Sequence, residues 1–172
     1  MNSIDANIIE ILNHRQILQK VRRLAIEIME RNTQEHELIV AGVNNRGMHF
    51  AGLLVEQLRE LSDAPIHLTR IRVNPANPVA EPVTIEMDLS ELDGKPVLVV
   101  DDVANTGRTL FYACKPLLDI LPKQLETAVL VDRTHKSFPI QVDYCGMSLA
   151  TTLKENIEVH FKDENNYRAV LK

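Results

Sequence analysis

Largely apolar segments alternate with segments of helical periodicity along the middle of this chain, and this alternation limits the folds available to it. The apolar segments are ELIVAGV at 37–43, KPVLVVDD at 95–102 and LETAVLVD at 125–132. Helical periodicity follows at 48–61 and again at 107–121, where Pro122 is expected to stop the helix. The pattern predicts an α/β protein with a doubly wound, mostly parallel sheet. Ligands of such sheets bind beyond the carboxyl ends of the strands.

An amphipathic helix is predicted at 13–32, before this alternation begins. Asn13 suits the N-cap. The apolar residues that share one face of this helix are Ile17, Val21, Leu24, Ala25 and Ile28. The preceding segment, NIIEIL at 7–12, is rich in β-branched residues and predicts a strand or an extended arm.

Residues 64–94 interrupt the alternation. Their ends are β-rich, but the middle contains Pro75, Pro78 and Pro82. Because proline cannot donate to a strand ladder, this segment is not a regular central strand throughout. We expect a small flexible hood or flap at about 65–95, built as a hairpin over the edge of the sheet. The whole chain, residues 1–172, is expected to form a single domain that includes this flap.

Composition and charge narrow the class of protein. The chain is 45% apolar and 25% charged, which is typical of a folded globular domain. No apolar run is long enough for a membrane span, and the N-terminus lacks a secretory pattern, so we expect a cytoplasmic protein without a membrane partner. The net charge of −5 means that a polyanionic partner needs a local basic patch. Cys114 and Cys145 have no CxxC partner and are expected to be buried free thiols.

Two adjacent acids, Asp101 and Asp102, end the apolar strand in VLVVDDVANTGRTL at 97–110. Burying unpaired charges is unfavourable, so these carboxylates must face solvent, a cation or hydroxyl donors. Ionised carboxylates only accept hydrogen bonds, and two side by side suit a vicinal diol such as a ribose. A charged turn that merely caps a helix would explain one Asp and one Thr of this run, but not the whole of it.

The residues after the acid pair predict an anion site. Thr106, Gly107, Arg108 and Thr109 stand at the expected start of a helix, where free N–H groups and the helix dipole attract anions. Gly107 also allows a close approach of the backbone. A sugar clamp beside an anion site predicts a ribose phosphate ligand. The chain lacks GxxxxGK[ST], so hydrolysis of a nucleoside triphosphate is disfavoured.

These motifs resemble those of a known family. VLVVDDVANTGRTL is similar to the signature that binds 5-phosphoribosyl-1-diphosphate (PRPP) in type I phosphoribosyltransferases. ELIVAGVNNRGMHFAGLL at 37–54 resembles their diphosphate loop. AVLVDRTHKSFPIQVDYCGMSLAT at 128–151 is similar to the base-side region of the bifunctional pyrimidine operon attenuators and uracil phosphoribosyltransferases. The resemblance runs from the first helix to the C-terminus and is weakest at 65–95.

The resemblance implies a set of site residues. The residues that would bind PRPP are Asn45, Arg46, Gly47, Asp101, Asp102, Ala104, Asn105, Thr106, Gly107, Arg108 and Thr109. Among them, Arg46, Asp101 and Asp102 would carry catalysis. The residues that would line the nucleobase pocket are Val131, Asp132, Arg133 and Ile140. Arg70 and Arg72 on the flap either stabilise the leaving diphosphate or form a solvated strand face.

The resemblance also implies the reaction. A nucleobase, uracil in the most similar members, would displace diphosphate from the anomeric carbon of PRPP. The family uses Mg²⁺, which Asp101 and Asp102 would contact through water or the ribose hydroxyls. Purine enzymes carry an Asp at the position of Asn105 as a proton acceptor, and its replacement by an amide disfavours a purine.

A second hypothesis is an RNA-binding regulator of pyrimidine genes that senses nucleotides with the same fold and has little or no catalysis. Arg15 and Arg22 share a helix face, and His135 and Lys136 lie on one turn, so these four would form the RNA face. The alternative is a solvated basic face beside Glu27. Family members usually form dimers or tetramers, and we expect a homo-oligomer here.

Overall fold

A six-stranded sheet forms the centre of the computed structural model, which describes residues 8–152 and 154–172. The strands are β1 (Ile9–Leu12), β2 (Leu38–Val43), β3 (Ile66–Arg72), β4 (Thr84–Ile85), β5 (Pro96–Ala104), β6 (Gln124–Arg133), β7 (Tyr144–Leu149), β8 (Ile157–His160) and β9 (Arg168–Leu171). The helices are α1 (His14–Arg31), α2 (Asn44–Leu61), α3 (Leu89–Leu92), α4 (Arg108–Ala113) and the 3₁₀ turn η1 (Lys115–Asp119).

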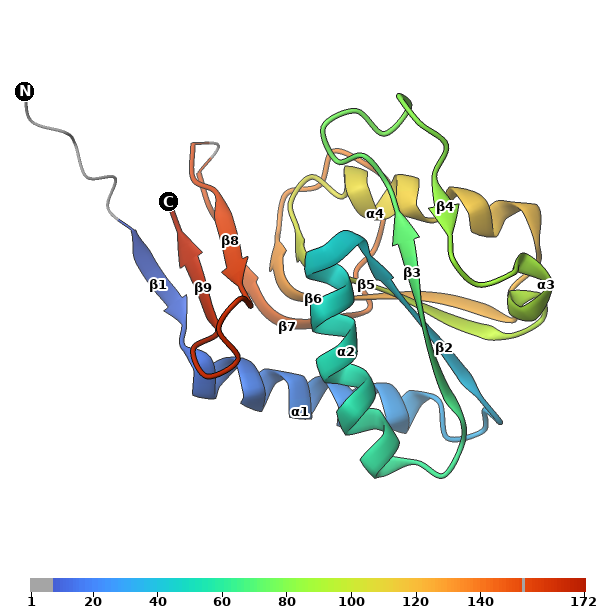
Figure 1. Cartoon of the computed structure of the whole chain (residues 1–172). Helices are drawn as coiled ribbons and strands as arrows, with labels where there is room; N and C mark the ends of the chain where they lie inside the picture. Colours follow the sequence, from blue (N-terminus) through green and yellow to red (C-terminus); the bar gives the residue numbers. More distant parts are fainter. Residues whose placement is uncertain (1–7, 153) are drawn as a thin grey trace, which may run out of the picture.

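The order of the large sheet is β4-β3-β2-β5-β6-β7 (Figure 1). All neighbouring strands are parallel except β3 and β4. Alternate side chains of the strands pack in two apolar layers, one on each face of the sheet. One layer packs against α1 and α2, and the other against α3, α4 and η1. Helices therefore cover both faces, which confirms the predicted doubly wound, mostly parallel sheet.

Helix α1 begins where the sequence predicts. Asn13 and Gln16 form a reciprocal capping box, in which each side chain accepts a hydrogen bond of 2.9 Å from the other residue's backbone N–H. The five predicted apolar residues are all buried against the sheet. The N-cap and the apolar periodicity are therefore sufficient to predict this helix from the sequence.

The two ends of the described chain form a separate three-stranded antiparallel sheet, β1-β9-β8. From here on we use the name hood for this sheet, and the name flap for the segment 65–95. Figure 1 shows the hood standing beside the six-stranded sheet. Its apolar residues, among them Val159, Phe161 and Tyr167, join the same core as α1 and α2. The predicted strand at the N-terminus is thus confirmed over Ile9–Leu12, and residue 7 lies outside the described residues.

The predicted flap at 65–95 requires a correction. β4 pairs with β3 at the edge of the sheet, which confirms a hairpin. However, Ile66–Arg72 is a full strand that also pairs in parallel with β2. Both of its faces are covered, because Ile66 and Leu68 pack in the layer against α1 and α2, and Ile71 packs in the opposite layer. The longest irregular stretch is residues 73–83, which contain Pro75, Pro78 and Pro82.

The predicted helix at 107–121 is also corrected. The α-helix ends at Ala113 and continues as the 3₁₀ turn Lys115–Asp119. Pro116 lacks the N–H that would continue the α-helical ladder, so the helix ends before it. Cys114 is buried and Cys145 half-buried, both as free thiols, so the expected burial applies to the first only. Among residues 8–152 and 154–172, no helix combines the length and apolar character needed to cross a membrane.

Candidate active site

Asp101 and Asp102 lie near the carboxyl end of β5, between β2 and β6. Their exposed fractions are only 7% and 8%. Burial raises the pKa of Asp101 well above its ordinary value, and the adjacent Asp102 carboxylate raises it further. Burial also raises the pKa of Asp102. The Arg46 guanidinium opposes both pKa shifts. The two acids therefore form a site of concentrated negative charge that favours a cation or hydroxyl donors.

Gly47 allows the first turn of α2 to close onto the end of β5. A Cβ atom at this position would lie 2.8 Å from the Val100 carbonyl oxygen and 3.0 Å from Asp101 Oδ1. These atoms belong to a central strand and to the acid pair, so they have little freedom to move. Because Gly47 has no side chain, the predicted diphosphate loop can lie directly beside Asp101 and Asp102, the predicted ribose-binding residues.

A pocket of about 510 Å³ opens over the acid pair. The predicted site residues that line it are Asn45, Arg46, Arg72, Asp101, Asp102, Asn105 and Thr109. The lining residues that the sequence analysis did not single out are Val43, Asn44, Val73, Pro75, Val103 and Ile157. The pocket thus unites the ends of β2, β3 and β5 with the hood strand β8.

The loop before α4 has a backbone shaped by Gly107, which adopts a left-handed conformation with φ of +85°. A Cβ atom there would collide with Ile140. The Thr106 carbonyl accepts hydrogen bonds from the N–H groups of Ser137 and Phe138, at 2.9 and 3.2 Å. Residues 103–110 enclose a separate small hollow of about 40 Å³. The loop therefore has the tight form predicted for an anion site, supported from behind by the segment after β6.

Asn44 is a site residue that sequence reasoning missed. It adopts a left-handed backbone conformation with φ of 52°. Its side-chain amide donates to the Val73 carbonyl at 2.8 Å, and its side-chain oxygen accepts from the Val73 N–H at 3.0 Å. Asn44 thereby ties the end of β2 to the end of β3. An Asn that directly follows a buried strand was the available signal, because Asn tolerates this backbone region better than most residues.

These parts are combined in a known protein family. The family model described as the phosphoribosyl transferase domain matches residues 7–163. The chain belongs to the phosphoribosyltransferase family. The most similar curated relatives include the bifunctional protein PyrR of Bacillus pumilus (strain SAFR-032), which is 31% identical over 93% of this chain and 95% of the relative. The pyrimidine operon regulatory protein of Lactococcus lactis subsp. lactis (strain IL1403) is 32% identical over 94% and 95%.

Solved structures agree on the fold of this phosphoribosyltransferase. A hypoxanthine-guanine phosphoribosyltransferase from Bacillus anthracis superposes with a TM-score of 0.71 at 19% identity, and covers 94% of this chain and 96% of its own. The hypoxanthine phosphoribosyltransferase of Trypanosoma cruzi gives a TM-score of 0.73 at 19% identity, with coverage of 93% and 94%. At these identities the likeness concerns the fold alone.

The two predicted flap cations of the phosphoribosyltransferase differ in position. Arg72 lines the pocket over the acid pair, and its guanidinium lies 3.2 Å from the Glu86 carboxylate. Arg70 does not line that pocket, and its Nε is buried without a hydrogen-bond partner within the described residues. Arg108 instead links the loop before α4 to the flap, because its guanidinium donates to the Pro75 carbonyl at 2.7 Å.

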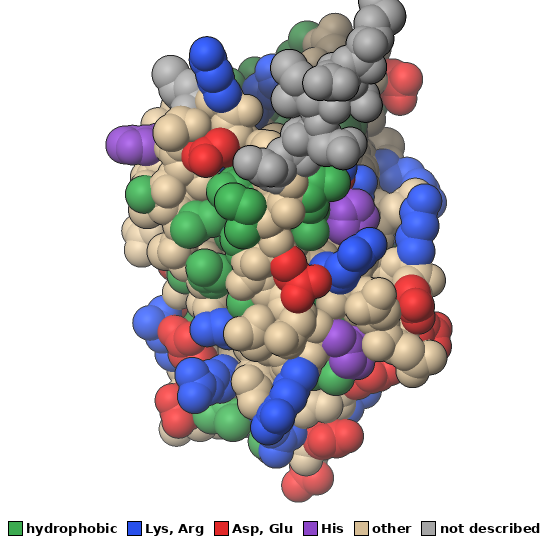
Figure 2. All heavy atoms as spheres, turned by 90° about the vertical axis from the view of Figure 1, so that its left-hand side faces the viewer, with side chains coloured by type: hydrophobic (Ala, Val, Ile, Leu, Met, Phe, Trp, Pro, Cys, Tyr) green, Lys and Arg blue, Asp and Glu red, His purple; other side chains and the backbone are tan. Residues whose placement is uncertain are grey.

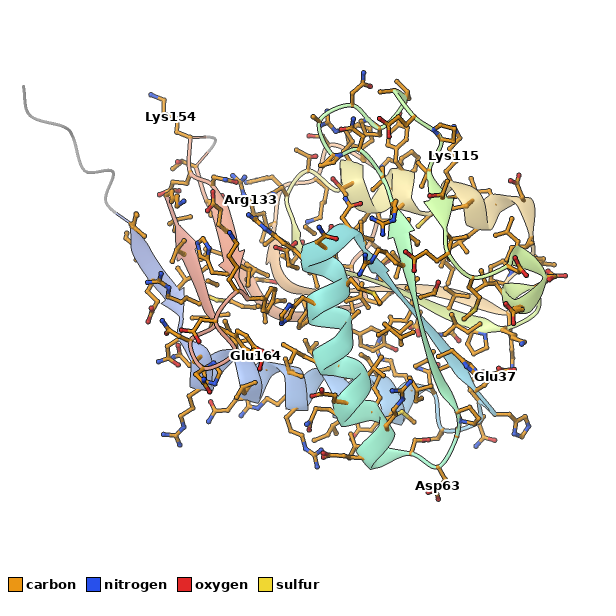
Figure 3. The ribbon with its side chains drawn as sticks, viewed as in Figure 1. Glu37, Asp63, Lys115, Arg133, Lys154 and Glu164 are labelled. Carbon is orange, nitrogen blue, oxygen red and sulfur yellow. The ribbon has the colours of Figure 1, made fainter. Side chains whose placement is uncertain are left out.

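None of the four predicted base-side residues is among the residues that line the pocket over the acid pair. The Val131 side chain is fully buried in the core, so only its backbone could meet a ligand. Asp132 accepts from Lys136, and Ile140 packs behind Gly107. Arg133 donates to Thr151 Oγ1 at 2.6 Å, to the Thr152 carbonyl at 2.9 Å and to Asn105 Oδ1 at 3.4 Å. Figure 3 shows Arg133 between the hood and the loop before α4.

The predicted RNA face is only partly accessible. Arg15 and Arg22 are both exposed on α1. However, Arg22 donates to Gln57 at 2.9 Å and lies 3.5 Å from the Glu60 carboxylate. His135 is exposed, whereas the Lys136 amine is half-buried against Asp132 and the Arg133 carbonyl, which corrects its expected place on an open basic face. Figure 2 shows Lys, Arg and His side chains mixed with acids around a hydrophobic group on the hood side.

Proposed function

We propose that this phosphoribosyltransferase transfers the phosphoribosyl group of PRPP to uracil and releases diphosphate. The observation that carries the proposal is that the buried acid pair and Arg46 line one pocket. The carboxylates of Asp101 and Asp102 suit the ribose hydroxyls, while Arg46 suits the diphosphate. The loop at 104–109 supplies the 5-phosphate site at one side of the acid pair. The chemistry of these groups suits the ribose, the diphosphate and the 5-phosphate of PRPP.

The proposed reaction needs positioning and electrostatics more than covalent chemistry. Positive charge develops on the sugar as diphosphate leaves, and the buried Asp101 and Asp102 carboxylates lie where they can stabilise it. Arg46 and Arg72 would stabilise the negative charge on the leaving diphosphate. The ties of Asn44 and Arg108 to the flap hold the irregular segment 73–83 beside the pocket, which limits the access of water.

The donor set fits a magnesium ion held mainly by the substrate. In the described part of the chain, no group of three or more His, Cys, Asp or Glu side chains could hold a metal. Asp101 and Asp102 offer carboxylate oxygens, which a hard cation prefers, and PRPP would supply further oxygens. The raised pKa values of both acids indicate that a nearby cation would stabilise their ionised forms. Mg²⁺ when bound would neutralise the diphosphate.

Uracil as the base rests on two supports. One relative is named as a pyrimidine operon regulatory protein, which favours a pyrimidine. The second is Asn105, an amide that lines the pocket and cannot take up a proton from a purine base. Asp132, Arg133, Ile140 and the Val131 backbone would complete the base side from behind the pocket.

Diphosphate release tests the transferase directly. The full chain is incubated with PRPP, magnesium and either uracil, hypoxanthine, guanine or xanthine. We expect release with uracil at least tenfold faster than with any purine, and a loss of at least 100-fold in Asp102→Asn. Asp63→Asn, on an exposed loop, serves as the control (Figure 3). PRPP binding without diphosphate release for any of the four bases would refute the proposal.

Regulation by RNA binding is a second candidate function, favoured by the relatives named as operon regulators. We propose that Arg15 and Arg22, with exposed His135, contact RNA phosphates. In Arg15→Gln/Arg22→Gln we expect at least fivefold weaker binding of a pyrimidine operon leader transcript and a shallower salt dependence, with Lys154→Gln as the control. Binding unaffected by the double substitution would contradict this face.

We also infer that the protein acts in the cytoplasm as a homo-oligomer, a dimer or a tetramer. The family resemblance supports this assembly. Exposed Leu118 and Leu121, at 76% and 80%, provide apolar surface that an assembly would cover. Sedimentation equilibrium of the full chain should give a mass of two or four chains. A single-chain mass at high micromolar concentration would contradict the inference.

A further inference from the structure

A second hollow of about 460 Å³ lies between α2 and the hood, outside the pocket over the acid pair. We call it the His49 pocket, after the residue that faces the hood from α2. Its lining residues are Asn45, Arg46, His49, Val159, His160, Phe161, Lys162 and Glu164. Figure 3 shows Glu164 on the turn after β8, beside α2. The hollow is nearly as large as the pocket over the acid pair. Neither the acid pair nor the loop at 104–109 is among its lining residues.

The floor of the His49 pocket is aromatic and well packed. The His49 ring stacks on Phe161 with centroids 4.9 Å apart and planes at 11°. Tyr167 meets both rings edge-on, at 5.7 Å from His49 and 5.5 Å from Phe161. Phe161 and Val159 are only 5% and 1% exposed. The floor is therefore a fixed surface within the core of the hood, above which polar side chains can hold a ligand.

The rim of the His49 pocket is predominantly basic. It carries Arg46, Lys162 and His160, whereas Glu164 is the one acid among its lining residues. Within residues 8–152 and 154–172, neither Arg46 nor Lys162 forms an ion pair. His160 lies 3.6 Å from the Glu158 carboxylate. A hollow with two unpaired cations and imidazole donors favours an anion, even though the whole chain is acidic.

Arg46 and Asn45 line both hollows. The Arg46 guanidinium acts electrostatically on Asp101 and Asp102 on one side and on Glu158 of the hood on the other. An anion that accepts hydrogen bonds from the Arg46 guanidinium takes up some of its N–H donors and offsets part of its positive charge. An anion in the His49 pocket would therefore draw Arg46 away from a diphosphate bound over the acid pair.

We propose that the His49 pocket binds a phosphate-bearing anion, and that Arg46 makes this binding compete with PRPP. The guanidinium, the amine and the imidazole are donors that match phosphate oxygens. The anion has two chemical sources, inorganic phosphate and the diphosphate released by the transfer reaction. The pocket lies next to the site where diphosphate would leave, so occupancy by product would slow the binding of the next PRPP. The binding itself does not require transferase activity.

The histidine side chains allow binding to be observed at the pocket itself. Ring C–H resonances of the full chain are followed by NMR during titration with inorganic phosphate and, separately, with diphosphate. His49 and His160 line the pocket, whereas His67 lies on β3 and pairs with Glu37. We expect saturable shifts at His49 and His160 and none at His67. The anion with the lower half-saturation concentration identifies the source.

Two matched substitutions test whether the shifts come from the proposed site. Lys162→Gln removes a rim cation, and we expect it to raise the half-saturation concentration at least fivefold. Lys154→Gln removes an exposed cation at the opposite end of the hood from Glu164, and we expect no change (Figure 3). Absence of shifts at His49 and His160, or shifts that Lys162→Gln leaves unchanged, would overturn the site even if the chain proves to be an active transferase.

Competition through Arg46 has its own measurement. PRPP binding is measured by calorimetry with and without a saturating concentration of the anion found by NMR. We expect the anion to weaken PRPP binding at least threefold in the wild-type chain and less than half as much in Lys162→Gln. Equal PRPP affinity with and without an anion that occupies the His49 pocket would overturn the role of Arg46.

Discussion

Asp101 and Asp102 combine two properties that stability alone would not favour, which are burial and adjacent negative charge. Their pKa values are raised chiefly because burial disfavours the ionised form. A carboxyl group whose pKa rises on folding stabilises the fold only while it is protonated. This contribution is complete below the pKa of the unfolded chain and is lost as the pH rises through the folded pKa. At neutral pH the acid pair therefore lowers the free energy of unfolding.

Replacing Asp101 by Asn should stabilise the protein and impair its ligand binding. The amide keeps the shape of the side chain but carries no charge, so we expect the free energy of unfolding to rise by about 1 kcal/mol, roughly 2–4 °C in Tm. We expect PRPP affinity to fall at least tenfold. Thermal unfolding at several pH values should show the difference from wild type shrinking as the pH falls through the raised pKa. An unchanged Tm at neutral pH would contradict this account.

Two glycines of α2 should respond oppositely to the same substitution. At Gly52 a Cβ atom meets nothing within 4 Å, so Gly52→Ala should stabilise the helix by about 0.5–1 kcal/mol. At Gly47 the Cβ atom would lie 2.8 Å from the Val100 carbonyl oxygen, so Gly47→Ala should destabilise by about 1–3 kcal/mol. We also expect at least tenfold weaker PRPP binding in Gly47→Ala alone. Urea unfolding and calorimetry provide both readouts, and similar results for the two variants would refute the close approach.

At the scale of single residues, the sequence predicts charges better than backbone conformations. Adjacent carboxylates after an apolar strand are chemically unusual, so Asp101 and Asp102 could be singled out directly. Asn44 could not, because its role depends on a left-handed backbone and on Val73, which is distant in sequence. The partners of Arg133 were equally inaccessible, since Thr151 and Asn105 meet it only through the tertiary fold.

At the scale of elements, the β3–β4 hairpin depends on Asn44. This side chain makes two hydrogen bonds to Val73, where the irregular flap segment begins. Asn44→Ala removes both, at about 0.5–1.5 kcal/mol for each bond. We expect faster hydrogen exchange at residues 73–83 and a three- to tenfold higher KM for PRPP.

The measurement needs a comparison within the same hairpin. Asn74 caps the backbone N–H groups of Ala76 and Asn77 on the exposed side. Asn74→Ala should speed local exchange but leave the KM for PRPP within twofold. Equal effects of Asn44→Ala and Asn74→Ala on that KM would argue against a specific tie to β3.

An element could be predicted when the residues that determine it lie close together in the sequence. α1 was predictable because its cap and apolar face are both encoded within Asn13–Ile28. α4 was predicted too long because periodicity continues past Pro116, although the proline prevents the α-helical bond. The pairing of β1 with β9 was not predictable, because no local pattern shows which of several short strands lie together.

At the scale of the whole molecule, Arg133 links the carboxyl end of β6 to the segment that leads into the hood. Its hydrogen bonds to Thr151 and Thr152 reach the segment before β8, while its bond to Asn105 reaches the loop before α4. Arg133→Gln should loosen this connection, so we expect faster hydrogen exchange in β8 and a KM for uracil raised at least fivefold. Arg168→Gln, an exposed substitution on β9, should change neither.

Steady-state kinetics can separate this tie from a direct role in PRPP binding. If Arg133 acts by holding the hood and Asn105, the KM for PRPP should change less than the KM for uracil. Loss of PRPP affinity alone, with normal exchange in β8, would contradict the proposed connection.

The overall architecture was predictable as a parallel α/β sheet because apolar strand segments alternate with segments of helical periodicity along the chain. Several residues that line the pocket over the acid pair could be singled out from the sequence, because they directly follow the apolar strands. The hood and its second hollow were not predictable, since they arise where the two ends of the chain meet α2. The sequence of a short terminal segment does not show which part of the fold it will pack against.

The position of β5 has a mechanical consequence for the acid pair. β5 is hydrogen-bonded to the parallel strand β6 along most of its length and to the parallel strand β2 over Val97–Val100, whereas the hood sheet contains only three short strands. A bending or twisting displacement of the hood therefore deforms its own loops before it strains β5. We therefore expect Asp101 and Asp102 to keep their position when the hood is displaced.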